Sequence, residues 1–143
     1  MEALGRTVNA QYLMDNRYVS LKDCQSVAFL CYLTGAAGDT YTLTEAQDAS
    51  GTGAQVLATI TRYHTNTGNG SDAWTLRTQA AASTVVTAAS ADQNCAWFEV
   101  DAAELSAGFD YVKVASTGAG VVIAVQTGLD VQRKPSNLVA IGV

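Results

Sequence analysis

The chain has 143 residues, of which 48% are hydrophobic and 15% are charged. This length suits one domain with its own core, and the charged fraction lies below the roughly 25% of ordinary soluble domains, which indicates that neighbours cover part of the surface. Thirteen acidic residues against eight basic ones give a net charge of −5. That balance argues against a surface that neutralises nucleic-acid phosphates.

No targeting or membrane segment is predicted. Residues 1–6 lack the basic start and apolar run of a signal peptide. No apolar run approaches the roughly 20 residues that cross a bilayer. We therefore expect neither secretion by that route nor a membrane partner.

Three cysteines, Cys24, Cys31 and Cys95, form no C-x-x-C pair. Their odd number argues against a complete set of disulfides within the chain, and their spacing argues against a zinc site. The simpler interpretation is that they are small buried side chains of a protein made in a reducing cytoplasm. The alternative is that a thiol bridges to another copy of the chain once the protein meets an oxidising medium.

The pattern of the chain predicts an all-β fold. Short β-branched runs are separated by clusters of Gly, Ser, Asn and Asp, which is typical of an antiparallel β-sandwich. Residues 25–33 are apolar on both faces and predict a central strand. In residues 40–45, Tyr41 and Leu43 alternate with threonines, which predicts a half-buried strand. Further strands are predicted at residues 74–77, 84–87, 96–100, 110–114 and 121–125.

Residues 56–63 fit two interpretations. Val56, Leu57, Ile60 and Tyr63 fall at helical spacing, although the same segment also fits an eighth strand. We prefer a short helix here.

A second helical turn is predicted to begin at Asp101. Asp101 stands three residues before Glu104, an arrangement that resembles a capping box, and Gly108 is placed to end the turn. A strand, a turn of helix and another strand should therefore follow one another.

The chain divides into three segments. Residues 1–22 predict an N-terminal arm or a first strand, residues 23–129 the β-sandwich domain, and residues 130–143 a C-terminal arm. The apolar finish, residues 138–143, either pairs as a final strand or lies along a neighbouring subunit. We expect a jelly-roll or immunoglobulin-like sandwich of about seven to eight strands, with one or two short helices and extended terminal arms. Strand order stays open, because it depends on long-range pairing.

No catalytic motif is found. His64 is the only histidine and stands beside a Gly/Asn loop, so neither a zinc triad nor a Ser-His-Asp triad is indicated. Glu99, Asp101 and Glu104 allow a carboxylate pair of a hydrolase, but their spacing is ordinary for a strand end followed by a helix cap. We expect no enzymatic activity, no cofactor and no metal.

Four segments carry a resemblance to a known family. Residues 39–46, 50–54, 97–105 and 108–114 resemble the small decoration, or cement, proteins of tailed-bacteriophage heads, within a likeness that spans roughly residues 25–127. The resemblance implies a structural virion protein without an active site, made in the cytoplasm of the host bacterium. Such a protein coats the outside of a finished head and stabilises contacts between major capsid protein subunits.

The resemblance also implies a homo-oligomer, with a trimer at threefold points of the capsid lattice as the expected form. Several weak contacts made at once would hold such a protein firmly. The candidate residues for contacts with the capsid or with another subunit are the mixed apolar and basic ones near the two ends: Tyr12, Leu13, Met14, Arg17, Tyr18, Arg133 and Lys134.

A second class of function stays open. Trp74, Trp97 and the loop around Asn69 allow a carbohydrate-binding or adhesin-like module of a phage tail or fibre. Aromatic rings present large apolar faces that can stack on a sugar. On alternating strands, however, tryptophans more often belong to the core or its rim.

Overall fold

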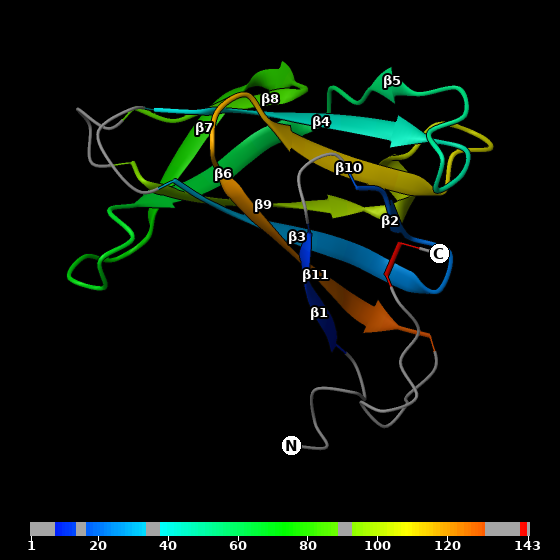
Figure 1. The fold of residues 1–143 in the computed structure, drawn as a ribbon, viewed down its shortest axis with the longest axis horizontal. Coiled ribbons are helices and arrows are strands. Elements are labelled where there is room, and N and C mark those ends of the chain that lie inside the picture. Colours follow the sequence, from blue (N-terminus) through cyan, green and yellow to red (C-terminus); the bar gives the residue numbers. More distant parts are fainter. Residues whose placement is uncertain (1–7, 14–16, 34–37, 89–92, 131–140, 143) are drawn as a thin grey trace.

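The computed structural model describes residues 8–13, 17–33, 38–88, 93–130 and 141–142. These residues form an all-β sandwich of two antiparallel sheets packed together (Figure 1). The predicted fold class is therefore confirmed.

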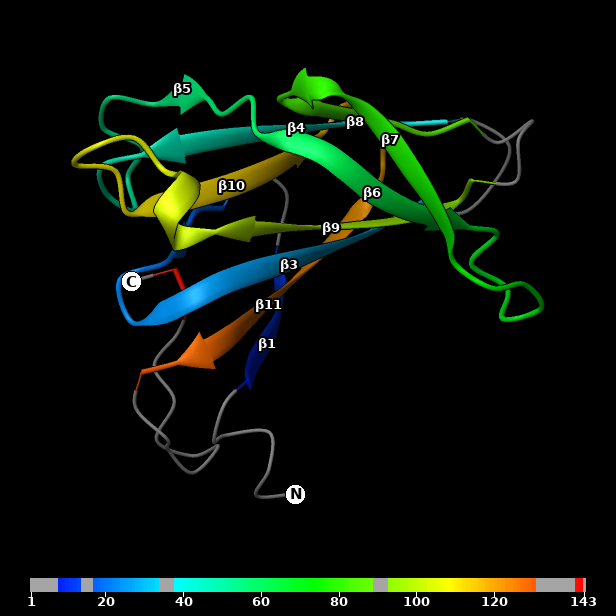
Figure 2. The same ribbon diagram turned by 180° about the vertical axis from the view of Figure 1, so that it is seen from behind.

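The larger sheet has six strands in the order β1, β11, β3, β9, β6, β7. It is best followed from behind, in Figure 2. Its strands, in that order, are Val8–Leu13, Val121–Leu129, Cys24–Tyr32, Cys95–Asp101, Ile60–Asn66 and Thr75–Ala82.

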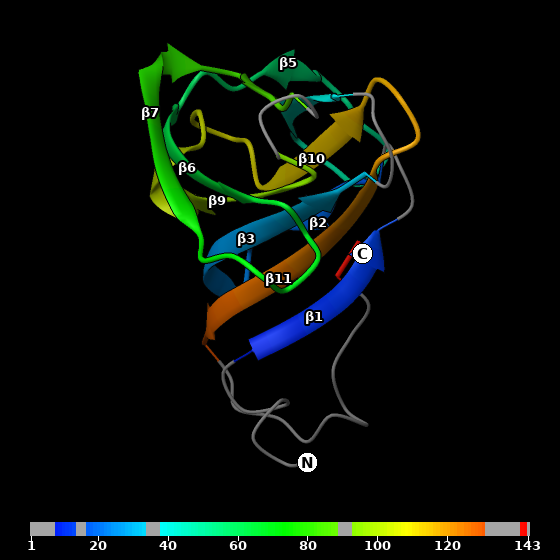
Figure 3. The same cartoon turned by 90° about the vertical axis from the view of Figure 1, so that its left-hand side faces the viewer.

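The smaller sheet has the order β2, β10, β4, β5, and β8 also pairs with β4. Figure 3 shows the larger sheet curving around it. The strands of the smaller sheet are β2 (Val19–Ser20), β10 (Tyr111–Ser116), β4 (Thr40–Ala46), β5 (Gln55–Val56) and β8 (Thr84–Val86).

The core lies between the two sheets and is built by strand alternation. In β3, Val27, Phe29 and Cys31 are fully buried and alternate with half-exposed residues. Phe29 meets Phe98 of β9, with ring centroids 5.7 Å apart. From the smaller sheet, Leu43 of β4 belongs to the same buried cluster.

The number of strands and one element differ from expectation. The described residues form eleven strands rather than seven or eight, because short edge strands such as β2 and β5 carry too little pattern to be recognised. The helix preferred for residues 56–63 is wrong: β5 ends at Val56 and β6 begins at Ile60. The backbone N–H of Leu57 donates to the carbonyl of Leu43, 3.2 Å away, so pairing between strands overrides the local helical spacing.

The helical turn at Asp101 is confirmed as a single 3-10 turn, η3 (Ala102–Glu104). The backbone N–H of Asp101 donates to the Glu104 carboxylate, 2.9 Å away, as in a capping box. Gly108, with φ of +85°, then reverses the chain into β10.

The described parts of the terminal segments lie on the sandwich. Val8–Leu13 is the edge strand β1, paired with β11. Ile141 is buried in the main core, while residues 131–140 lie outside the described residues, as does most of the expected C-terminal arm. Within the described part of the chain, no helix is long and apolar enough to span a membrane.

Candidate functional site

A row of mostly apolar side chains crosses the larger sheet on the face directed away from the core. The strand register places Leu76, His64, Trp97, Leu30 and Ile123 side by side on five successive strands, from β7 to β11. Leu76 is 43% exposed, and the other four are half-buried. We call these five residues the outer row. With neighbouring strands about 4.8 Å apart, the row is about 20 Å long.

The direction of the outer row follows from its neighbours in sequence. Ala96 and Phe98 flank Trp97 in β9, and both are buried in the core. Because successive side chains of a strand point to opposite faces, Trp97 points outward. The same alternation places Leu30 outward, between the buried Phe29 and Cys31.

Two members of the row form an aromatic pair. The rings of His64 and Trp97 lie parallel, with centroids 4.8 Å apart and an interplanar angle of 7°. This stacking across the β6–β9 pair holds the indole in place on the outer face.

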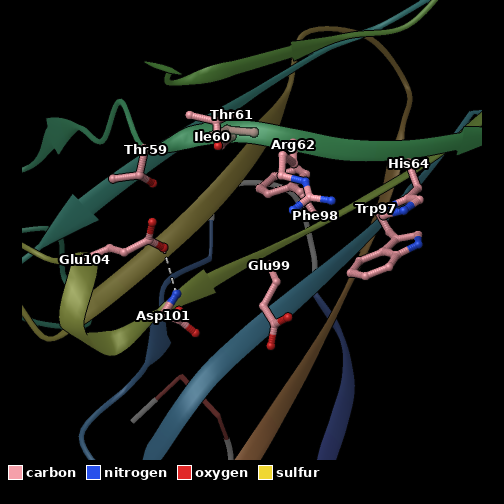
Figure 4. A pocket seen from close by; sticks show the side chains of 10 residues that line it. All are labelled: Thr59, Ile60, Thr61, Arg62, His64, Trp97, Phe98, Glu99, Asp101 and Glu104. Atoms are coloured by element: carbon pink, nitrogen blue, oxygen red, sulfur yellow. Dashed lines mark hydrogen bonds between the residues drawn. The ribbon is translucent and has the colours of Figure 1, made fainter. Parts of the chain in front are cut away.

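A groove opens beside this pair, where β6 and β9 diverge. The two strands pair only over His64–Asn66 and Cys95–Trp97, and beyond that point the space between them is a groove of about 230 Å³. Figure 4 shows its lining. The residues that line it are Thr59, Ile60, Thr61, Arg62, His64, Trp97, Phe98, Glu99, Asp101 and Glu104.

Of the residues that line the groove, two belong to the core and four carry charge. Ile60 and Phe98 belong to the buried core. Three carboxylates, those of Glu99, Asp101 and Glu104, lie on the β9–η3 side, and one guanidinium, that of Arg62, comes from β6 (Figure 4).

Two of the rim carboxylates also have structural partners. The hydroxyl of Ser26 donates to Glu99 over 2.6 Å, and Glu104 accepts the capping bond from the Asp101 N–H. These bonds hold the two carboxylates in position at the rim.

Among the described residues, no group of three or more His, Cys, Asp or Glu side chains is arranged to hold a metal ion. The side chains that line the groove offer a ligand stacking, hydrogen bonding and charge.

Glu45 of β4 is a buried carboxylate that does not line the groove but holds the turn beside it. Its buried carboxylate accepts hydrogen bonds from Gln55 Nε2 at 2.6 Å and from the backbone N–H and hydroxyl of Ser106 at 2.9 and 2.5 Å. Burial alone would raise the pKa of Glu45, but the bonds from Ser106 and Gln55 together lower it. Ser106 follows η3, so Glu45 anchors the turn that carries Glu104.

A second buried carboxylate, Asp39, joins two loops at the end of the smaller sheet. It accepts hydrogen bonds from Ser116 Oγ, from the N–H groups of Thr40 (2.7 Å), Thr117 (3.1 Å) and Gly118 (3.0 Å), and from Thr117 Oγ1 (2.9 Å). Burial by itself would raise the pKa of Asp39, but these bonds hold it below its usual value. Asp39 therefore has a structural role away from the groove.

The candidate contact residues of the N-terminal segment are placed in different settings. The backbones of Tyr12 and Leu13 pair in β1 opposite Ile123 and Val122 of β11. Met14, Arg133 and Lys134 lie outside the described residues.

Arg17 and Tyr18 differ sharply in exposure. Arg17 is exposed, whereas Tyr18 is only 7% exposed and packs within its own chain against Ala46 and Tyr111. The Lys113 ammonium lies 4.9 Å from the centroid of the Tyr18 ring. The Tyr18 side chain therefore makes these contacts within its own sandwich.

The three cysteines are free and buried. Burial raises the pKa of the Cys24 thiol to about 11 and also raises the pKa values of Cys31 and Cys95. A buried, protonated thiol is a poor nucleophile. A disulfide between copies would therefore require the sandwich to open locally.

The features suggested for a carbohydrate-binding module are not brought together in the groove. Trp97 lines it, but Trp74, 41% exposed, precedes β7 and is not among the lining residues. Asn69 lies in the β6–β7 loop, where its side-chain oxygen accepts hydrogen bonds from Thr67 Oγ1 at 2.7 Å and from the Ser71 N–H at 2.9 Å.

In comparisons with known proteins, no family model matches this chain, and neither a curated protein nor a solved structure is similar to it. The fold and the site above thus rest on the chain's own residues.

Proposed function

We propose that this protein is a structural virion protein that binds the outside of a bacteriophage head and stabilises contacts between major capsid protein subunits. The observation that carries the proposal is the outer row. In this row, Leu76 is exposed, and Trp97, Leu30 and Ile123 are half-buried, all on one face of the larger sheet. Contiguous apolar surface rimmed by polar groups is typical of a site that docks onto another protein.

The shape of the surface supports a docking role. Five neighbouring strands of one sheet carry the row, so its side chains are held by the backbone ladder rather than by loops. A surface already in its bound shape loses little conformational entropy on binding. An oligomer whose copies each make one such contact on the capsid lattice would gain affinity through multivalency.

The alternative, a saccharide-binding module, has weaker support. Of the features that suggested it, only Trp97 lines the groove. The outer row favours a protein surface as the partner, because three of its five members, Leu76, Leu30 and Ile123, have no side-chain group that hydrogen-bonds to a sugar.

Purified protein mixed with undecorated mature heads should bind saturably, which sedimentation and cryo-electron microscopy would show. Leu76→Asp and Trp97→Ala should weaken this binding at least tenfold, because a central aromatic anchor contributes about 2 kcal/mol or more to such an interface. Val56→Asp is the matched control: Val56 is 63% exposed but lies in β5 of the other sheet. Absence of saturable binding by the unmodified protein would remove the proposal, as would equal binding by all three variants.

A further inference from the structure

We propose that the groove between β6 and the β9–η3 segment receives a lysine or arginine side chain from an extended basic segment of the protein's partner. The inference names the partner chemistry of the proposed docking surface and so rests on the proposed function. Its support comes from three properties of the groove: its charge, its aromatic end and its size.

The charge of the groove favours a cation. Glu99, Asp101 and Glu104 place three carboxylates at the rim against the single guanidinium of Arg62. The whole chain adds a net charge of −5. Such a field attracts a basic segment and repels an acidic one.

The aromatic end of the groove suits the long stem of a basic side chain. Lysine and arginine bury their methylene groups on apolar surface while the charged head stays near polar groups. The half-buried ring of Trp97, stacked on His64, stands at one end of the groove and offers apolar surface there, whereas Ile60 and Phe98 are almost fully covered (Figure 4). A cation near an indole gains a further attraction.

The size of the groove suits a side chain. Its volume of about 230 Å³ lies below the roughly 300–1,000 Å³ of sites that enclose whole small molecules. The groove also adjoins the outer row, since His64 and Trp97 belong to both. A partner seated on the row would therefore reach the groove with one side chain.

Trp97 fluorescence in the full-length Trp74→Phe protein would report binding, because the chain has only two tryptophans. The probe is a blocked tetra-arginine peptide, titrated at low and at high salt. We expect a saturable change in Trp97 emission that weakens as salt rises.

Paired neutral variants test the role of the rim. In Glu99→Gln/Asp101→Asn, both side chains keep their size and an acceptor oxygen, so the Ser26 bond to residue 99 is preserved. We expect this double variant to bind tetra-arginine about threefold more weakly or worse. Asp130→Asn is the matched control, because Asp130 is exposed and outside the groove, and its affinity should not change.

The inference is overturned if tetra-arginine gives no saturable response, or if the double variant binds as tightly as the control. Saturable binding of a neutral oligosaccharide without tetra-arginine binding would also overturn it, and would favour the saccharide module. If heads bind the double variant as tightly as they bind the unmodified protein, the inference is contradicted, and the proposed function still stands. If the protein binds tetra-arginine but binds no heads, the groove takes a basic side chain as inferred, and the proposed function is contradicted.

Discussion

Asp39 is a buried carboxylate whose hydrogen bonds make the stability of this fold depend on pH. It is 3% exposed, and its hydrogen bonds come from hydroxyl and backbone N–H groups. The folded-state pKa of Asp39 lies below its unfolded value of about 3.9, so its contribution to stability is present above that value. The contribution is lost as the pH falls through the lower, folded-state pKa. The lowered pKa of Glu45 acts in the same direction.

Asp39→Asn should lower the free energy of unfolding at pH 7 by about 1–3 kcal/mol, because an amide nitrogen cannot accept the bonds that the second oxygen receives. The difference from the unmodified protein should shrink as the pH falls from about 5 through the unfolded-state pKa of about 3.9 and then through the lower folded-state pKa, because the unfolded carboxyl is protonated before the native one. Urea denaturation across this range measures both quantities. In the control Asp130→Asn, the exposed carboxylate is replaced, and the unfolding free energy should stay near that of the unmodified protein. Parallel curves for Asp39→Asn and the unmodified protein over the whole range would show that Asp39 does not carry this dependence.

At the scale of elements, β9 separates the residues that stabilise the fold from those that serve the surface. Phe98 is 1% exposed and packs against Phe29, whereas Trp97 is half-buried and points outward. Phe98→Ala should cost about 3–5 kcal/mol of unfolding free energy, because it leaves a cavity in the core. Trp97→Ala should cost less than half of that, and thermal and chemical denaturation of the two variants would test the ranking. A reversed order would mean that Trp97 belongs to the core, and its effect on head binding would then report folding.

The sequence predicted elements well where a strand alternates and poorly where packing decides. In β4, Tyr41 and Leu43 alternate with threonines, and the predicted range 40–45 falls within the observed Thr40–Ala46. Residues 56–63 gave a period compatible with helix and strand, and backbone pairing of Leu57 with Leu43 decided for the strand. The local spacing of apolar residues carries no signal of such a bond, because the partner residue lies elsewhere in the chain.

The candidate site was predicted only in part, for the same physical reason. Trp97, Glu99 and Glu104 were singled out from their types and spacing, but His64 was interpreted as a residue beside a loop. The available signal was that Arg62 and His64 alternate with Tyr63 and Thr65 along one strand. What the sequence does not encode locally is the register that stacks His64 on Trp97.

At the scale of the whole molecule, the last described residues close the sandwich near its first strands. Ile141 is 2% exposed, belongs to the main core, and accepts a 2.7 Å hydrogen bond at its carbonyl from the N–H of Ser20 in β2. The apolar finish of the chain therefore contributes at least one side chain to its own core. The expectation was that this finish pairs as a final strand or lies along a neighbouring subunit.

Ile141→Ala should lower the free energy of unfolding by about 2–5 kcal/mol, as for any large side chain removed from a packed core. The matched control is Val56→Ala, since Val56 is 63% exposed and its truncation should change the free energy by less than about 0.5 kcal/mol. Urea denaturation of both variants measures the difference. If Ile141→Ala unfolds like the control, the end of the chain does not brace the sandwich. A large loss of stability in Ile141→Ala alone would show that the end of the chain stabilises its own sandwich.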